Sequence, residues 1–196
     1  MPTDLCGLSL LRDPARNKGT AFSLEERQRL ALEGLLPARV ESLEQQVERC
    51  WQAFQGLRHP LEQYSYVEAL RLSNLVLFHR FLAEHLRAVL PIVYTPTVGA
   101  VIQGFSRSYR TPVEGVFLNA DQRGRLREVL KSSVHTPVDL VLVTDAEGIL
   151  GIGDQGVGGI HICQGKLAVY TLCAGLDPRR VLDRKSTRLN SSHLVI

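Results

Sequence analysis

Apolar side chains recur at helical spacing through the first 90 residues of the chain. A first helix is predicted after Ser23, because Ser23 and Glu26 have the spacing of a capping box and the following run lasts to Gly34. A second is expected from Val40, with Gly56 as its stop. Its apolar face consists of Val40, Leu43, Val47, Trp51 and Phe54. Further helices are predicted over residues 61–72 and 74–90.

The pattern changes beyond residue 90. In the stretch Pro-Ile-Val-Tyr-Thr-Pro-Thr-Val-Gly over 91–99, Pro96 and Gly99 interrupt a β-branched run and leave Tyr94 at the end of a short strand or in a loop. Later, Asp121 is a plausible cap for a basic helix. The apolar run 138–144 is typical of a strand buried on both faces.

The region after this run predicts a hairpin and then a helix. Residues 145–148 resemble a tight turn, and 149–152 would return as a second strand. An apolar helix is expected from about Gly158 to Cys173, with Lys166 as its one charged residue. The prediction is α/β overall: a mainly helical N-terminal domain over 1–130, followed over 131–182 by the start of an incomplete parallel-sheet α/β domain.

Composition and charge narrow the class of protein. Of the 196 residues 44% are hydrophobic and 22% are charged, which excludes collagen-like, low-complexity and strongly disordered chains. The net charge is only +3 and the basic residues are scattered, so we expect no nucleic-acid partner. Four cysteines without C-x-x-C spacing predict reduced thiols and a cytoplasmic location. No signal peptide is recognised, and we expect no membrane span, which needs about 18 apolar residues.

Two side chains are candidates for acid–base chemistry. Lys166 on its apolar helix either reaches water with its ammonium or is partly desolvated and suited to act as a general base. Tyr94 either hydrogen-bonds a backbone carbonyl or acts as a general acid. The histidines His79 and His85 lack partners at metal-ligand spacing.

Glycines and carboxylates near residue 150 have alternative interpretations. Gly151, Gly153 and Gly156 match G-x-G-x-x-G, which indicates either a dinucleotide site or close backbone packing. In dinucleotide-binding folds the first glycine of this motif directly follows the first strand, whereas here a second short strand would separate the glycines from the strand at 138–144. The acidic residues near these glycines are interpreted as turn residues whose side chains bond the backbone, with metal binding as the alternative. They are Asp145, Glu147 and Asp154.

Several motifs, in their order along the chain, resemble the N-terminal part of malic enzyme over roughly residues 10–182. They are Asn-Lys-Gly-Thr-Ala-Phe at 17–22, Gly-Leu-Leu-Pro at 34–37, the 91–99 stretch, Val-Thr-Asp at 143–145, Ile-Leu-Gly-Ile-Gly-Asp at 149–154 and Gly-Lys-Leu at 165–167. The resemblance implies oxidative decarboxylation of L-malate to pyruvate and CO2 with NAD or NADP and Mn2+ or Mg2+, by a homo-oligomer. It implies that Lys166 is the general base and that Tyr94 protonates the enolpyruvate carbon.

The sequence departs from the family pattern in one substrate-binding motif. Many malic enzymes have Asp-Gly-Glu-Arg, whose arginine holds a malate carboxylate, where this chain has Asp-Ala-Glu-Gly and ends the motif at Gly148. His161 is a candidate replacement cation, although it lacks the bidentate fork of arginine. The same version resembles malolactic enzymes, which convert malate to lactate and CO2.

The end of the chain departs from the family as well. The family's metal-binding carboxylates and nicotinamide domain belong downstream, so we assign no cofactor-binding or metal residue and expect the chain alone to be inactive. Residues 183–196 resemble translated adapter sequence and are interpreted as a foreign tail. A non-catalytic helical interaction module is the alternative from another class. A truncated parallel sheet would leave an unpaired edge, which predicts poor solubility or self-association.

Overall fold

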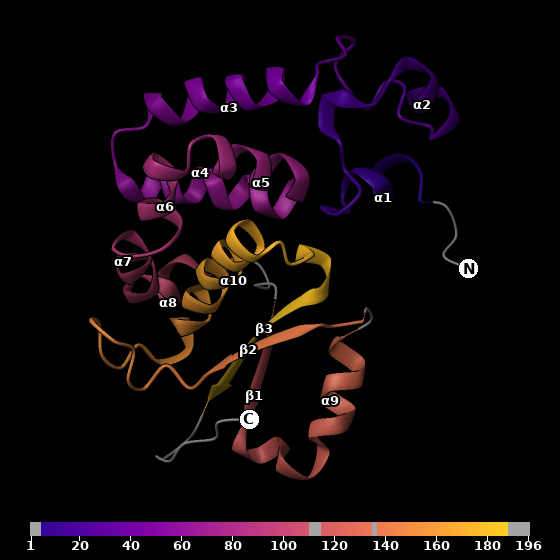
Figure 1. The fold of residues 1–196 in the computed structure, drawn as a ribbon. Helices are drawn as coiled ribbons and strands as arrows, with labels where there is room; N and C mark the ends of the chain where they lie inside the picture. Colours follow the sequence, from indigo (N-terminus) through magenta and orange to yellow (C-terminus); the bar gives the residue numbers. More distant parts are fainter. Residues whose placement is uncertain (1–4, 110–114, 135–136, 188–196) are drawn as a thin grey trace. The chain divides into compact units, whose positions relative to one another are not determined.

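The computed structural model describes residues 5–109, 115–134 and 137–187, and the chain forms two compact units. The first is Met1–Val93 and the second is Tyr94–Ile196. This division differs from the predicted boundary near residue 130, because a strand before residue 130 belongs to the same sheet as those after it. The elements of each unit are coloured along the sequence in Figure 1.

The first unit is helical throughout its described residues, as the sequence predicts for the N-terminal region. Its elements in order are α1 (Gly7–Leu11), the 3-10 turn η1 (Gly19–Ala21), α2 (Leu24–Arg29), α3 (Leu43–Gly56), α4 (Pro60–Ser73), α5 (Leu75–Glu84) and α6 (Leu86–Val93). The predicted capping box is confirmed, because the Ser23 side chain accepts from the Glu26 amide and the Glu26 carboxylate accepts from the Ser23 amide.

Three helix boundaries in this unit differ from the predictions. The helix after Ser23 ends at Arg29 and not at Gly34. The next begins at Leu43, because Ser42 and Gln45 form a second capping box there, so Val40 precedes the helix and is exposed. The helix expected over 74–90 is two helices, separated at His85.

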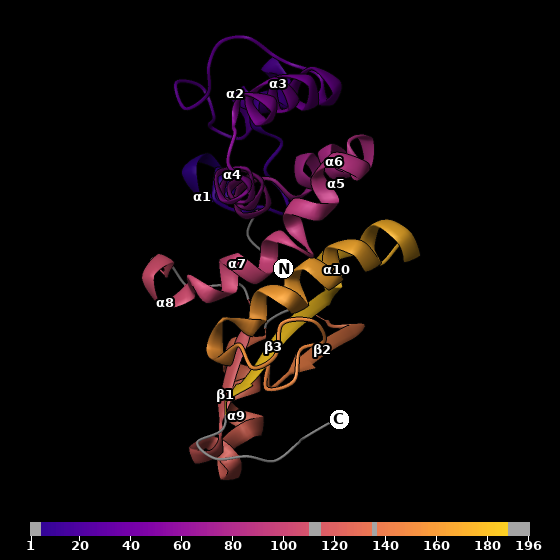
Figure 2. The same ribbon diagram turned by 90° about the vertical axis from the view of Figure 1, so that its left-hand side faces the viewer.

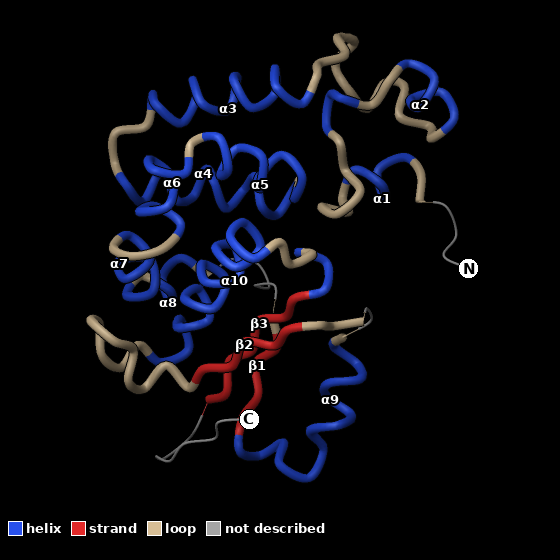
Figure 3. The backbone as a smooth tube through the Cα atoms, in the orientation of Figure 1, coloured by secondary structure: helices blue, strands red, loops and turns tan. Residues whose placement is uncertain are grey.

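The interior of the first unit lies where α3, α4 and α5 pack together (Figure 3). Trp51 and Phe54 of α3 form an aromatic cluster with Phe81, and His85 stacks on Trp51 with 3.9 Å between ring centroids. Aromatic contacts of this kind add to the free energy gained by burying the rings. The predicted apolar face of α3 is therefore core at Val47 and Phe54, with Trp51 partly buried.

The second unit combines a small sheet with helices. Its elements in order are α7 (Thr97–Gln103), α8 (Phe105–Ser108), β1 (Val116–Asn119), η2 (Ala120–Arg125), α9 (Leu126–Ser133), β2 (Leu140–Thr144), η3 (Gly156–Gly159), α10 (Ile160–Ala174), η4 (Pro178–Arg180) and β3 (Val181–Thr187). Asn119, with Gln122, caps η2, in place of the predicted Asp121.

The described strands pair in the order β1-β3-β2, and both pairings are parallel. The chain therefore moves two positions across the sheet from β1 to β2 and one position back to β3. Right-handed crossovers then require α9 and α10 to lie on opposite faces of the sheet. Figure 2 shows α10 lying along β3 and β2, with α9 on the other side of the strands. The described strands are parallel and are joined by helices, as the sequence predicts. The described sheet is too small to confirm an α/β domain.

Strand β2 is less buried than its apolar sequence predicts. It is at the edge of the described sheet, its residues are partly buried or exposed, and 41% of Val141 is accessible to solvent. The prediction of a strand buried on both faces is wrong for this reason. The supposed foreign tail also differs from expectation: the backbone of residues 183–187 continues β3 between β1 and β2, whereas 188–196 lie outside the described residues.

The predicted β-hairpin is wrong, because residues 149–153 form a tight closed turn. The amide of Ile149 donates to the carbonyl of Gly153 at 3.1 Å, and the amide of Gly153 donates back at 2.8 Å. Gly151 has a φ of 85° and Gly153 a φ of 71°, which are left-handed values that a strand does not contain.

One stretch of the described residues, Leu86–Gln103, is long and apolar enough to cross a membrane by length and composition, against the sequence prediction. It comprises α6 and α7 with Tyr94–Pro96 between them, and 33% of it is buried in the structure. Core helices of soluble proteins meet the same criterion, so this stretch is weak evidence for a membrane span.

Candidate active site

Tyr94 lies at the start of α7. Its carbonyl accepts a hydrogen bond from the amide of Val98 at 3.0 Å, which joins it to the first turn of the helix, and the following Thr95–Pro96 peptide is cis. Of the two predicted placements of Tyr94, the loop is confirmed and the end of a strand is wrong, because Tyr94 lies in the connection between α6, which contains Pro91 and ends at Val93, and α7. The half-buried Tyr94 side chain packs against a core cluster. Its buried members are Val98, Ile102 and Ile162.

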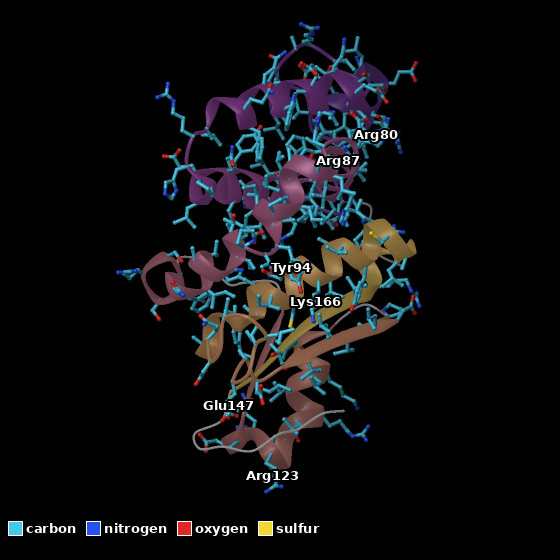
Figure 4. All side chains as sticks on the ribbon, turned by 60° about the vertical axis from the view of Figure 1, so that its left-hand side comes forward. Arg80, Arg87, Tyr94, Arg123, Glu147 and Lys166 are labelled. Atoms are coloured by element: carbon cyan, nitrogen blue, oxygen red, sulfur yellow. The ribbon has the colours of Figure 1, made fainter. Side chains whose placement is uncertain are left out.

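Lys166 lies in the middle of α10 and is also half-buried. It is four residues after Ile162, so the two side chains share one face of the helix. Because Tyr94 packs against the cluster that contains Ile162, Lys166 is on the side of α10 that faces the start of α7. Figure 4 shows the labelled side chains of Tyr94 and Lys166 close together.

Both polar groups of this pair are available to a bound molecule. In the part of the chain that the structure describes, neither the phenol of Tyr94 nor the ammonium of Lys166 has a hydrogen-bond or ion-pair partner. Lys166 is surrounded along α10 by buried residues, among them Gly165 and Leu167. A lysine and a tyrosine near one another can take up and give up protons at a small bound molecule.

The glycine motif does not form a dinucleotide-binding turn directly after a strand. Gly151, Gly153 and Gly156 all have positive φ and shape the turns between β2 and η3. The next two glycines have a different role, because they allow close packing. A Cβ atom at Gly158 would lie 2.8 Å from the Cβ of Phe105, and one at Gly159 only 2.1 Å from the Cβ of Ala146. The three motif glycines themselves have no atom within 4 Å of the place of a Cβ, so their positive φ, and not close packing, accounts for them.

The acidic residues near this turn hold the backbone. The Asp145 carboxylate accepts from the Glu147 amide at 3.1 Å, and the Asp154 carboxylate accepts from the Gly156 amide at 2.9 Å. These are the side-chain turns expected of aspartate in loops. Among the described residues there is no group of three or more His, Cys, Asp or Glu side chains placed to hold a metal ion.

His161 lies in the first turn of α10 beside Phe105. Its Nδ1 is 2.9 Å from the amide oxygen of Gln164, and because that oxygen only accepts, Nδ1 carries the proton. The ring meets Phe105 edge-on, with 5.6 Å between centroids. Gly148, where the resemblance implies an arginine in many relatives, has no atom within 4 Å of the place of a Cβ. A longer side chain would therefore fit there.

The sequence singled out Tyr94 and Lys166, and the structure places their side chains near one another (Figure 4). It did not single out Ala146, Gly158 and Gly159, although they hold the start of α10 against the rest of the unit. The run Gly-Val-Gly-Gly at 156–159 was the available signal, since consecutive small residues before a helix indicate close approach of another element.

The second unit combines helices with a small parallel sheet, and it places a lysine and a tyrosine near one another. Comparison with known proteins gives the family. Residues 72–186, more than half of the chain, match the family described as "Malic enzyme, N-terminal domain". The chain belongs to the malic enzyme family.

Several relatives are similar over nearly the whole chain. NAD-dependent malic enzyme 3 of Bacillus subtilis is 48% identical over 182 residues, covering 92% of this chain and 32% of the relative. The NAD-dependent malic enzymes of Idiomarina loihiensis and Erwinia tasmaniensis are 43% and 44% identical over 176 residues, covering 90% of this chain and 31% of each relative. The chain thus spans about a third of the length of the relatives it matches.

Proposed function

We propose that this chain supplies the acid–base pair of an NAD-dependent malic enzyme, which oxidatively decarboxylates L-malate to pyruvate and CO2. The observation that carries the proposal is that Tyr94 packs against the cluster containing Ile162, while Lys166 lies one turn after Ile162 on the same face of α10. In the described part of the chain neither polar group has a partner. The printed names of the similar proteins support the same reaction.

The two residues divide the proton transfers between them. In its neutral form, Lys166 accepts the proton of the malate C2 hydroxyl as the alcohol is oxidised to the ketone. After CO2 leaves C3, Tyr94 donates its phenolic proton to that carbon and converts enolpyruvate into pyruvate. The apolar side chains of Val98, Ile102 and Ile162 keep this part of the site poor in water, which strengthens both interactions with the substrate.

The cofactors are assigned less completely than the proton transfers. We infer NAD from the relatives' names, NADP being the alternative, and a divalent Mn2+ or Mg2+ from the family resemblance. The role proposed for the described residues is the pair of proton transfers by Lys166 and Tyr94. We expect the chain alone to be inactive, since it spans about a third of its relatives.

Malolactic conversion of malate to lactate and CO2 is the second candidate. It is favoured by Gly148, because a site without an arginine at this position resembles the malolactic version of the motif. If His161 serves as the replacement cation, it does so through Nε2, since Nδ1 donates to Gln164.

The biological setting is also a proposal. We propose a cytoplasmic homo-oligomer that acts on L-malate, without nucleic-acid or membrane partners. Of these features, the cytoplasmic location is supported by cysteines that form no disulfide among the described residues.

Product analysis distinguishes the candidate functions. Residues 1–182 of this chain, joined to the remainder of the B. subtilis relative, would be incubated with L-malate, NAD and Mn2+. We expect pyruvate and NADH in equal amounts. Lactate without net NADH formation would support the malolactic reaction. Absence of both products, from a chimera that is folded and binds NAD, would contradict the enzymatic proposal and favour an interaction module.

A further inference from the structure

The start of α10 is packed unusually closely against two other parts of the second unit. On one side are Ile102 at the end of α7 and Phe105 at the start of α8, and on the other is Ala146 in the loop after β2. Both contacts are made by glycines that directly precede the helix. Neither glycine has a positive φ, so backbone conformation does not require glycine at these two positions. The close contacts do require it.

Gly158 makes the contact with α7 and α8. An added Cβ would lie 2.9 Å from the carbonyl oxygen of Ile102 and 2.8 Å from the Cβ of Phe105. Both are atoms of the backbone or next to it, so no side-chain rotation can make room. An alanine at this position therefore requires α10 to move away from α7 and α8.

Gly159 and Ala146 share a space that holds one methyl group. The added Cβ at Gly159 would lie 2.1 Å from the methyl carbon of Ala146, nearly in its place. With φ at −58° and ψ at −10°, Gly159 has a backbone that alanine adopts freely. Ala146, in contrast, is at φ 59°, where glycine is favoured. The methyl group could therefore be moved from one residue to the other.

We propose that Gly158 and Gly159 are positioning residues, which set the placement of Lys166 relative to Tyr94. A helix is stiff, and Lys166 is seven residues after Gly159, about 10 Å along the axis. An added methyl group shifts the start of α10 away from α7 at Gly158 and away from the loop after β2 at Gly159. Either shift is carried to the lysine, while Tyr94 stays with the first turn of α7. Displacements of about 1 Å between reacting groups are sufficient to reduce catalysis strongly. This inference rests on the proposed function for its catalytic meaning, but the geometry can be tested without turnover.

The test measures the proximity of the two side chains directly. The full 196-residue chain would be treated with a difluorodinitrobenzene cross-linker, a short reagent that bridges amines and phenols, and the Tyr94–Lys166 cross-linked peptide would be quantified by mass spectrometry. The variants are G158A, G159A and the exchange A146G/G159A. Gly124→Ala is the matched control, because Gly124 has open space around it and no positive φ. Circular dichroism establishes that each variant is folded.

We expect the cross-link to form in the unmodified chain and in the Gly124 control. Its yield should fall several-fold in G158A and G159A at equal helix content. The exchange variant should restore it, since the same space again holds one methyl group.

Two results would overturn the proposal: unchanged yield in folded G158A and G159A, or loss in G159A without recovery in the exchange. If a glycine variant does not fold, the exchange variant still decides, because a folded exchange with low yield contradicts the positioning role. Failure of the proposed function can be told apart from failure of this inference. In that case the Tyr94–Lys166 cross-link would form normally, but the chimera would not turn over malate.

Discussion

At the scale of single residues, the clearest structural role belongs to Arg27. Its guanidinium is buried, with 4% of the residue accessible, and in the described part of the chain its partners are all backbone carbonyls. The oxygens come from both sides of the irregular connection between α2 and α3, so one side chain holds this connection in place. The carbonyls belong to Thr20, Phe22, Pro37, Ala38 and Arg39, at 2.7–3.3 Å.

We predict that Arg27→Met strongly destabilises the first unit. The substitution keeps the length of the side chain but removes the donors to the buried Phe22 carbonyl and to partly buried carbonyls of the connection, at a cost of about 3 kcal/mol in the free energy of unfolding. Urea denaturation monitored by circular dichroism would measure it. Arg29→Met, at an exposed position of the same helix, is the control and should change stability by less than about 0.5 kcal/mol. Equal effects of the two substitutions would contradict the role of Arg27.

A second residue predicts how stability depends on pH. Burial lowers the pKa of His79 below its ordinary value of 6.5, Arg71 acts in the same direction, and the hydrogen bond to the carbonyl of Leu75 opposes them. The unfolded chain therefore binds a proton more readily than the folded one. The stabilisation from a neutral His79 is complete above pH 6.5 and is lost as the pH falls from there through the folded-state pKa.

The His79→Gln variant should consequently lose less stability than the unmodified chain between pH 7 and pH 5. Thermal melts across this range would show it as a shallower acid limb, with parallel curves above pH 7 serving as the internal control. Identical slopes in the acid range would show that His79 does not carry the pH dependence.

At the scale of elements, the sequence predicted the helical first unit well, because amphipathic spacing and capping boxes are local signals. The sequence-based predictions are wrong where contacts distant in sequence determine the secondary structure. The 149–152 run has the apolar pattern of a strand, but the left-handed glycines around it close a turn. Strand β2 has the sequence of a central strand, yet β3 pairs on one side of it and leaves the other side open in the described sheet.

Some features of the candidate site could likewise be predicted from local sequence, whereas others depend on tertiary contacts. Lys166 and Tyr94 could be identified from an unusual charge in an apolar helix and from a family motif. The contact between Ala146 and Gly159 could not, because it depends on how a loop after β2 meets the start of a helix that begins 14 residues after Ala146. No local pattern encodes that approach.

The open edge of β2 leads to a prediction about self-association. An exposed edge strand with apolar side chains offers unpaired backbone groups to a second chain. We expect the chain alone to associate, and Val141→Lys to reduce that association by placing a charge on the edge. Val76→Lys, at a similarly exposed position on α5, is the control and should leave it unchanged. Sedimentation velocity would measure both, and a monodisperse monomer for the unmodified chain would contradict the expectation.

At the scale of the whole molecule, both proposed proton-transfer residues lie in the unit that begins at Tyr94. This placement means that the acid and the base are held by one compact body, whatever the remainder of a malic enzyme contributes. The chain supplies about a third of the length of its relatives, so its catalytic role has to be measured with the remaining part present.

The most direct measurement is therefore malate-dependent reduction of NAD by the chimera with the B. subtilis relative, with and without Lys166→Ala. We predict activity in the chimera and its loss by at least about 100-fold in the folded alanine variant, since general-base catalysis contributes roughly that factor or more. Near-normal turnover by the Lys166→Ala chimera would contradict the assignment of this lysine as the base.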